Sequence, residues 1–256
     1  MSACQRNAWV EMSEMSAALS IAYCGPAPLP AELLSRWNFD PPLLIALAAL
    51  AVVFARRRSA NAPAGWAALV LMVLVFVSPL CALSSALFSA RVFHHVLLVS
   101  IVAPLLAVAF PARDGPALPL GLLVALNAVV LWTWHMPAPY AWALATVPGY
   151  WLMQGTLLGS AWLLWRAVFA PATAVGEALV ALVATVAQMG LLAALIVFAS
   201  RPLYAAHIFT APLWGMDPLV DQQLAGLLMW VPGSLPYLAV GLWMAWRSLR
   251  PAGTTA

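Results

Sequence analysis

The sequence has very little charge. Only 7% of its 256 residues are charged, lysine is absent, and there are just four histidines and three cysteines. Soluble domains carry about 25% charged residues, whereas 65% of this chain is hydrophobic. The composition excludes an ordinary soluble globular domain and indicates a membrane protein.

The sequence signatures of common enzymes are missing as well. The chain contains no phosphate-binding loop, dinucleotide-binding fingerprint, GxSxG nucleophile turn or HExxH zinc motif. We therefore expect a protein that is not an enzyme. The net charge of +3 comes largely from arginines that we expect at the inner membrane face. It therefore indicates topology, and we expect no nucleic-acid partner.

Long apolar stretches are what the chain has in abundance. A spanning helix needs about 20 mostly apolar residues, somewhat fewer if flanking groups snorkel. Seven stretches qualify, and segments rich in proline or arginine separate them: residues 41–55, 66–83, 93–110, 118–134, 150–169, 178–199 and 224–246. The sequence predicts an all-α fold, a polytopic helical bundle with seven transmembrane helices in the lipid bilayer.

The arginines predict the orientation of this bundle, because cytoplasmic loops carry an excess of positive charge. If the turn at residues 56–58 is cytoplasmic, seven arginines fall inside: Arg56, Arg57, Arg58, Arg113, Arg166, Arg247 and Arg250. Four fall outside: Arg6, Arg36, Arg91 and Arg201. We expect an N-out, C-in protein with an outer tail (1–40), a membrane domain (41–250) and a cytoplasmic tail (251–256).

All four histidines fall on the outer side of this arrangement. They are His94 and His95 at the end of the third stretch, His135 at the end of the fourth, and His207 in the loop after the sixth. Ionisable groups at membrane depth are costly, so a one-sided cluster indicates a site. Imidazole suits copper, soft sulfur favours the cuprous ion, and imidazole pairs also ligate haem.

Local spacing refines the roles of these histidines. His94 and His95 are adjacent, so on a helix they point about 100° apart and do not easily bind one metal together. Arg91 lies four residues before His95 on the same face, where it would keep His95 neutral by repulsion or recruit an anion. The neutral imidazole is the form that binds metals. An interfacial polar residue without a ligand is the plainer interpretation of His94 and His207, whereas for His95 and His135 it is as open as a ligand role.

The cysteines allow two interpretations each. Cys4 and Cys24 would face an oxidising compartment and could pair, or both could be dispensable thiols. Cys81 lies at the depth of the histidines, where it is either a metal ligand or a small buried hydrophobe. Gly155 and Gly159 form a small-xxx-small pair, which favours close helix packing within the bundle.

Asp221 precedes the seventh stretch, where a carboxylate can cap free backbone N–H groups. The alternative role is to orient a metal-binding histidine from outside the ligand set. His135 lies in the segment 132–140, which reads WTWHMPAPY and ends at Tyr140. Two prolines make a rigid exit from the helix, and the aromatic residues fit an interfacial belt.

Three segments, residues 84–98, 134–140 and 221–233, give the chain a resemblance to a known family. Through these segments the chain resembles the membrane-integral, CtaG-type cytochrome c oxidase assembly proteins, and the similarity covers about residues 40–250. The resemblance implies a seven-helix protein of the bacterial cytoplasmic (inner) membrane that helps to mature a haem-copper oxidase, with copper delivery to its dinuclear copper centre. By motif match it assigns the functional core to His95, His135 and Asp221.

The chain departs from the family pattern at Arg91, where a histidine often stands. If that histidine and the one matching His95 chelate copper in the family, Cys81, His94 or His207 would have to substitute here. Our leading hypothesis is a copper-handling assembly factor in which His95, His135 and Cys81 hold copper. Its partners would be oxidase subunits or other copper chaperones.

Two other functions are compatible with the same residues. The first is a haem-binding electron carrier or quinol-oxidising subunit with His95 and His135 as axial ligands. The second is a structural partner of an oxidase complex that binds no metal.

Overall fold

The computed structural model describes residues 23–57, 61–112 and 118–249. These residues form an all-α bundle of ten α-helices: α2 (Pro41–Arg56), α3 (Ala62–Phe76), α4 (Pro79–Ala86), α5 (Phe88–Val96), α6 (Ala103–Ala109), α7 (Leu120–His135), α8 (Pro137–Ala145), α9 (Val147–Val168), α10 (Val175–Val197) and α11 (Pro218–Ser248). Shorter turns are η1 (Pro30–Ser35), η2 (Leu97–Val102), η3 (Ala205–His207) and η4 (Ala211–Trp214). The predicted fold class is confirmed as all-α.

Several helices are long and apolar enough to cross a membrane. Three qualify alone: Phe88–Ala109, which joins α5, η2 and α6, together with α10 and α11. The pairs α3–α4 and α7–α8 raise the number to five if each bent pair is one span. These helices indicate a multi-pass membrane protein, while the count of seven spans stays a prediction.

Both bends lie at prolines. The sequence shows where these prolines are but not the angle at which the helices meet. The axis turns by 48° between α3 and α4 and by 73° between α7 and α8. Pro79 and Pro137 lie in the first turn of the second helix of each pair, where the missing N–H does no harm. The residue before each proline, Ser78 or Met136, is extended, as steric clash with the proline ring requires. Helix α8 therefore follows α7 directly and at an angle to it, where the sequence suggested a loop.

The central span is continuous but changes its winding. Residues 97–102 of η2 are π-helical, and such segments occur frequently at functional sites. In this pattern the carbonyl of Val99 would accept from residue 104, but Pro104 has no N–H. The indole Nε1 of Trp165 donates to that carbonyl at 3.1 Å instead. The proline thus explains how α9 is tied to the central span.

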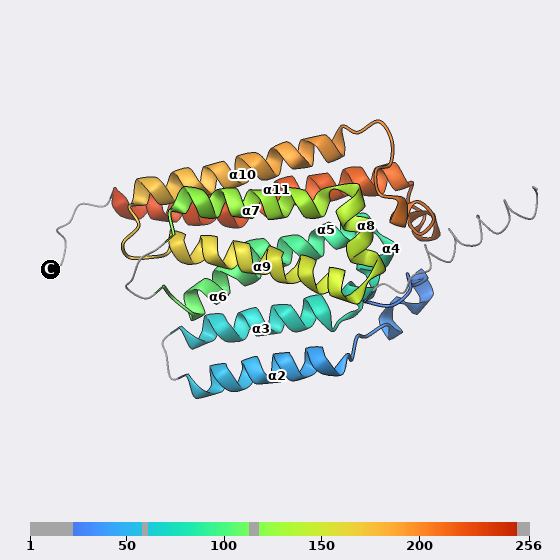
Figure 1. Cartoon of the computed structure of the whole chain (residues 1–256), viewed down its shortest axis with the longest axis horizontal. Helices are drawn as coiled ribbons and strands as arrows, with labels where there is room; N and C mark the ends of the chain where they lie inside the picture. The colour runs from blue at the N-terminus through green and yellow to red at the C-terminus, as the bar shows by residue number, and fades with distance from the viewer. Residues whose placement is uncertain (1–22, 58–60, 113–117, 250–256) are drawn as a thin grey trace, which may run out of the picture.

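The long helices run side by side along the longest axis of the molecule (Figure 1). Helix α11 packs against α10 and α5, and α9 packs against α6, α7 and α8. Helix α2 packs chiefly against α3 and lies at one edge of the bundle. The span that carries His94 and His95 therefore lies inside the bundle, in contact with helices on several sides.

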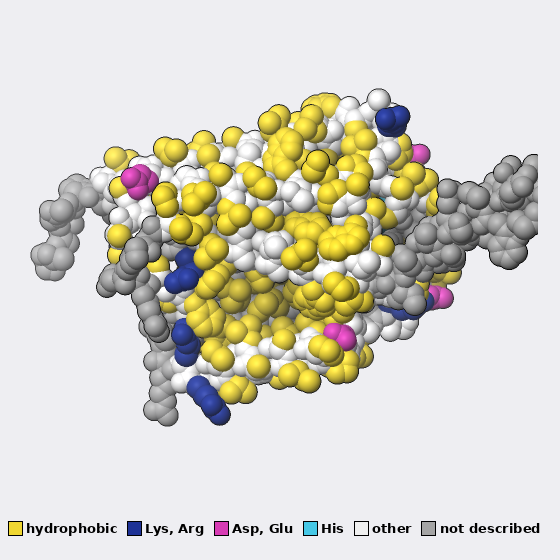
Figure 2. Space-filling view, in the orientation of Figure 1, with side chains coloured by type: hydrophobic (Ala, Val, Ile, Leu, Met, Phe, Trp, Pro, Cys, Tyr) yellow, Lys and Arg dark blue, Asp and Glu magenta, His cyan; other side chains and the backbone are white. Residues whose placement is uncertain are grey.

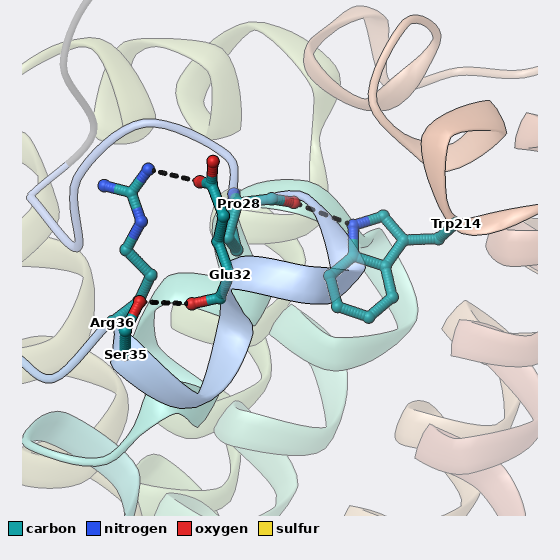
Figure 3. Close-up of polar contacts among 5 residues, drawn as sticks. All are labelled: Pro28, Glu32, Ser35, Arg36 and Trp214. Atoms are coloured by element: carbon teal, nitrogen blue, oxygen red, sulfur yellow. Dashed lines mark hydrogen bonds and ion pairs between the residues drawn. The ribbon is translucent and has the colours of Figure 1, made fainter.

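The described part of the expected N-terminal tail is packed against the bundle. The indole of Trp214 donates to the carbonyl of Pro28 at 3.1 Å, which ties the N-terminal segment to the loop between α10 and α11 (Figure 3). Glu32 and Arg36 form an exposed ion pair at 2.8 Å. Residues 23–40 therefore lie at the end of the bundle at which α5, α9 and α11 begin.

The charged side chains gather at the two ends, with a broad hydrophobic surface between them (Figure 2). At the end away from residues 23–40, Arg57 donates to the carbonyl of Ala109 at 3.1 Å and Arg166 donates to that of Pro111 at 3.3 Å. Both are arginines that the sequence assigns to the inner side. The arrangement fits the predicted orientation, which remains a prediction.

Candidate metal-binding site

His94 and His95 lie deeper than the sequence suggests. Helix α5 begins at Phe88, so the histidines are about 10 Å from its first residue at 1.5 Å per residue. Both side chains are buried. Their rings are edge-to-face with centroids 5.9 Å apart, and the ring of Phe76 lies edge-on against His94 at 5.2 Å. The expected helix start near residue 93 is therefore wrong by about five residues.

Asp221 explains why α5 begins where it does. Its carboxylate accepts hydrogen bonds from the backbone N–H of Phe88 at 2.7 Å, the N–H of Ser89 at 3.0 Å and the Ser89 hydroxyl. A carboxylate at a helix N-terminus satisfies free donors and interacts favourably with the helix dipole. The capping role expected of Asp221 thus applies to α5, whereas Asp217 caps Asp221's own helix through Leu219 N at 2.8 Å.

His135, the last residue of α7, faces His95 from the neighbouring helix. The two ring centroids are 5.8 Å apart and the rings are nearly perpendicular. The Nδ1 of His135 lies 2.7 Å from the carbonyl oxygen of Leu131. Because a carbonyl only accepts, Nδ1 carries the proton, and the neutral ring has its lone pair on Nε2. This buried Nε2 has no hydrogen-bond partner among the described residues.

Gln154 of α9 completes the surroundings of His95. Its Nε2 lies 3.4 Å from His95 Nε2, while its Oε1 and His95 Nδ1 have no partner in the described part of the chain. The side chain is 1% exposed. The amide nitrogen can only donate, so His95 Nε2 accepts and the proton of the neutral ring lies on Nδ1. The contact holds the ring of His95 in place.

Arg91 brings a buried positive charge into this region. It is fully buried, its Nε donates to the carbonyl of Ser84 at 3.2 Å, and its guanidinium lies 5.4 Å from the centre of the Tyr150 ring. It interacts electrostatically with His94 and His95. The expected role of Arg91 in keeping His95 neutral stays a prediction.

His207 lies apart from the other histidines. Its Nε2 is 2.7 Å from the hydroxyl of Tyr140, and its ring is 5.9 Å from that of Phe88. Burial and then the charge of Arg91 lower the pKa of His207 to about 3. The Tyr140 hydroxyl therefore donates to a neutral imidazole. No ring contact joins His207 to another histidine in the described residues, so Tyr140 and His207 form a separate polar pair.

Tyr204 links this pair to the site. Its hydroxyl donates to the backbone carbonyl of His135 at 2.8 Å, and its ring stacks on Phe88 at 3.7 Å. The loop after α10 thus contacts both histidine-bearing elements, α5 and α7.

Cys81 is bonded to Cys24 in the structure. The Tyr150 hydroxyl lies 3.6 Å from Cys24 Sγ and 4.0 Å from Cys81 Sγ. A disulfide sulfur has no thiolate to offer a metal, so the expectation that Cys81 is a soft third ligand is not compatible with this pairing. Cys4, which the sequence suggested as a partner of Cys24, lies outside the described residues.

The structure thus brings three imidazoles together, because the His95 ring contacts both His94 and His135. It leaves out His207 and Cys81. Within residues 23–57, 61–112 and 118–249, no group of three or more His, Cys, Asp or Glu side chains is placed to hold a metal ion. Gln154 and Tyr204 were missed by sequence reasoning. The only signal for Gln154 is an amide within the apolar stretch 150–169, and an amide is not a typical copper ligand.

The fold and this site together define a multi-pass, all-α membrane protein with a buried histidine pair near one end of its bundle. A family model described as the cytochrome c oxidase caa3 assembly factor family (Caa3_CtaG) matches residues 119–251, just over half of the chain. The protein belongs to this family. The matched region begins one residue before α7, so it includes His135, Gln154 and Asp221 but not His95. Comparisons with curated proteins and with solved structures give no significant match.

Proposed function

We propose that this member of the oxidase assembly family carries copper, with one cuprous ion bound between His95 and His135. The protein would span the bacterial cytoplasmic membrane seven times, N-out and C-in, with the histidine pair towards the outer face. The observation that supports the proposal most directly is the facing pair of buried imidazoles on α5 and α7, 5.8 Å apart, each with a nitrogen that has no partner among the described residues.

The ring separation suits one shared ion. Bonds of about 2 Å from an ion to each imidazole nitrogen place the two nitrogens within about 4 Å of each other. Because each nitrogen lies on the rim of its ring, a centroid distance of 5.8 Å is compatible with such a bridge when the two ligating nitrogens are turned toward each other. Imidazole is a suitable copper ligand.

The surroundings keep both rings in the form that binds metals. The Leu131 carbonyl holds the proton of His135 on Nδ1, so Nε2 is the ligating atom. The Gln154 amide nitrogen lies 3.4 Å from Nε2 of His95 and can only donate to it. Copper binding through His95 Nδ1 would therefore require the amide to turn over, so that its oxygen accepts from Nε2–H. The neutral imidazole is the form that binds metals.

Two protein donors suit a carrier better than a permanent copper site. An ion with only two ligands from this chain can accept a further ligand from a partner, so it can pass between proteins by ligand exchange. Oxidase subunits or copper chaperones that approach the end of the bundle at which residues 23–40 lie would be the donor or acceptor. Asp221 supports the site by fixing the start of α5.

The test is a cuprous titration of the detergent-purified protein under anaerobic conditions. Ascorbate as the reductant leaves the Cys24–Cys81 disulfide intact, and a competing chromophoric chelator reports affinity. We expect about one ion per chain, and at least tenfold weaker binding in His95→Ala and His135→Ala. His207→Ala is the matched control, because His207 is equally buried but bonded to Tyr140.

Unchanged copper binding in both His95→Ala and His135→Ala would refute the proposal. The optical spectrum of the same sample tests the haem alternative, because a Soret band that disappears with either substitution would assign the pair to haem. Copper-free protein that still associates with an oxidase complex would favour the purely structural role.

A further inference from the structure

A hydrophobic groove lies beside the histidine pair, between α2, α3 and α9. It has a volume of about 360 Å³, within the range of small-molecule sites. Leu43 and Leu50 of α2 line one wall, and Met72 and Phe76 of α3 also contribute. Figure 2 shows a hollow with hydrophobic side chains on this face of the molecule, above α2.

The groove follows the direction of the lipid chains in a bilayer. Leu43 and Leu50 are seven residues apart, which corresponds to about 10 Å along the helix axis. The helices run along the long axis of the bundle (Figure 1), so a chain that fills the groove would lie roughly parallel to neighbouring acyl chains. The lining contains no charged residue, which disfavours an occupant with an ionic group inside the groove.

One lining residue has a polar side-chain amide, and its position is informative. Gln154 lines the groove and is 1% exposed, yet its Oε1 has no hydrogen-bond partner among the described residues. A buried polar atom without a partner is destabilising, so an observed one calls for an explanation. The other end of the same amide contacts His95.

We infer that the groove binds a membrane amphiphile with a single apolar chain and an uncharged hydroxyl head, and that this hydroxyl bonds to Gln154. A hydroxyl both donates and accepts, so it can pair with whichever end of the amide is free. The apolar chain extends from Gln154 along α2. The hydroxyl forms a hydrogen bond with the unpaired amide atom of Gln154, and the apolar chain fills the groove.

The glycines of α9 provide a way to block the groove. Gly155 lines it, and a Cβ built on Gly155 would meet no atom within 4 Å. The same holds for Gly159, which is not part of the lining. Neither glycine is a site of close helix packing, in contrast to the interpretation of the small-xxx-small pair. Gly155→Leu should therefore fill the groove without a backbone clash, and Gly159→Leu is its matched control.

The experiment is photolabelling of the full chain in phosphatidylcholine nanodiscs, without copper. The probe is a dodecanol with a diazirine in its chain, and mass spectrometry locates the labelled peptides. We expect labelling of α2, α3 and α9 that unlabelled dodecanol competes. Gly155→Leu should lower it at least tenfold, and Gly159→Leu should leave it unchanged.

A second variant tests the role of the head group. A probe with a methyl group in place of the hydroxyl should label the native groove roughly fivefold less, the effect of one neutral hydrogen bond. Gln154→Leu should remove this difference between the probes while the apolar chain still binds. The result does not depend on copper, so it stands or fails separately from the proposed copper site.

Labelling that spreads over all lipid-facing helices, or that dodecanol does not compete, would overturn the inference. So would equal labelling of Gly155→Leu and Gly159→Leu, provided that both variants retain the thermal stability of the native protein. Equal labelling by the two probes in the native protein would refute the hydroxyl contact with Gln154.

Discussion

Replacing Asp221 with alanine should destabilise the protein far more than the same change at Asp217. Both carboxylates cap helices, but they differ in burial. Asp221 is fully buried and accepts three hydrogen bonds at the start of α5. Asp217 is exposed and caps α11 through Leu219 N at 2.8 Å. The pair therefore separates the cost of losing a buried cap from that of losing an exposed one.

The magnitudes follow from the donors left behind. Asp221→Ala leaves the backbone N–H groups of Phe88 and Ser89 buried without an acceptor, at about 1–3 kcal/mol each, so we expect a loss of about 4 kcal/mol. Loss of an exposed cap costs about 1 kcal/mol. At roughly 2–4 °C per kcal/mol for a chain of this size, Tm should fall by about 8–16 °C for Asp221→Ala and about 2–4 °C for Asp217→Ala.

The assay is thermal unfolding of both variants in one detergent, followed by tryptophan fluorescence. Copper affinity should also fall in Asp221→Ala, because α5 carries His95, but it should not change in Asp217→Ala. Equal Tm values for the two variants would show that the carboxylate of Asp221 does not hold α5 in place, and the account of this helix start would have to be abandoned.

Three further predictions concern other parts of the bundle. Cys24→Ser should lower the free energy of unfolding by up to about 4 kcal/mol, the loop-entropy value for the 57-residue separation from Cys81. Gly226→Ala should cost about 1–3 kcal/mol, because its Cβ would lie 2.5 Å from Val197 Cγ2. In the unfolded chain the histidine at position 207 is protonated below about pH 6.5, whereas in the folded protein the pKa of buried His207 is about 3. His207 should therefore contribute a loss of about 2 kcal/mol between pH 6.5 and 5, which a pH series of Tm values for the native protein and a His207 variant would show.

Each of these predictions has a simple control. A reductant should lower the Tm of the native protein and leave that of Cys24→Ser unchanged; an equal effect on both would contradict the disulfide. Gly176→Ala, whose Cβ meets nothing within 4 Å, should be neutral, and equal Tm values for Gly176→Ala and Gly226→Ala would refute the close packing. His207→Gln should have a flatter pH dependence than the native protein, and identical slopes would exclude His207 as the titrating group.

Helix existence could be predicted well because apolar stretches and prolines are local features. Pro41 opens α2 where the sequence expected a helix, and α10 and α11 overlap their predicted ranges. The bends at Pro79 and Pro137 could not be predicted as angles, because a proline ends one helix without fixing the direction of the next. As a result, the sequence predicts most of α4 as part of a span and α8 as part of a loop.

The site was less predictable because its contacts join distant residues. The Asp221 carboxylate is 132 residues from Ser89 in the sequence, so no local pattern connects it to the start of α5. The Cys24–Cys81 pairing likewise depends on how residues 23–40 fold back onto α4. The shared side of the four histidines suggested one cluster, whereas packing separates His207, which bonds to Tyr140, from the pair His95–His135.

The central claim is that His95 and His135 bind one cuprous ion through nitrogen alone. X-ray absorption of the copper-loaded protein, with the disulfide intact, tests it most directly. The account predicts nitrogen scatterers at about 2 Å and no sulfur shell, with the signal lost in the His95→Ala/His135→Ala double variant. A copper–sulfur shell, or an unchanged spectrum in the double variant, would contradict it.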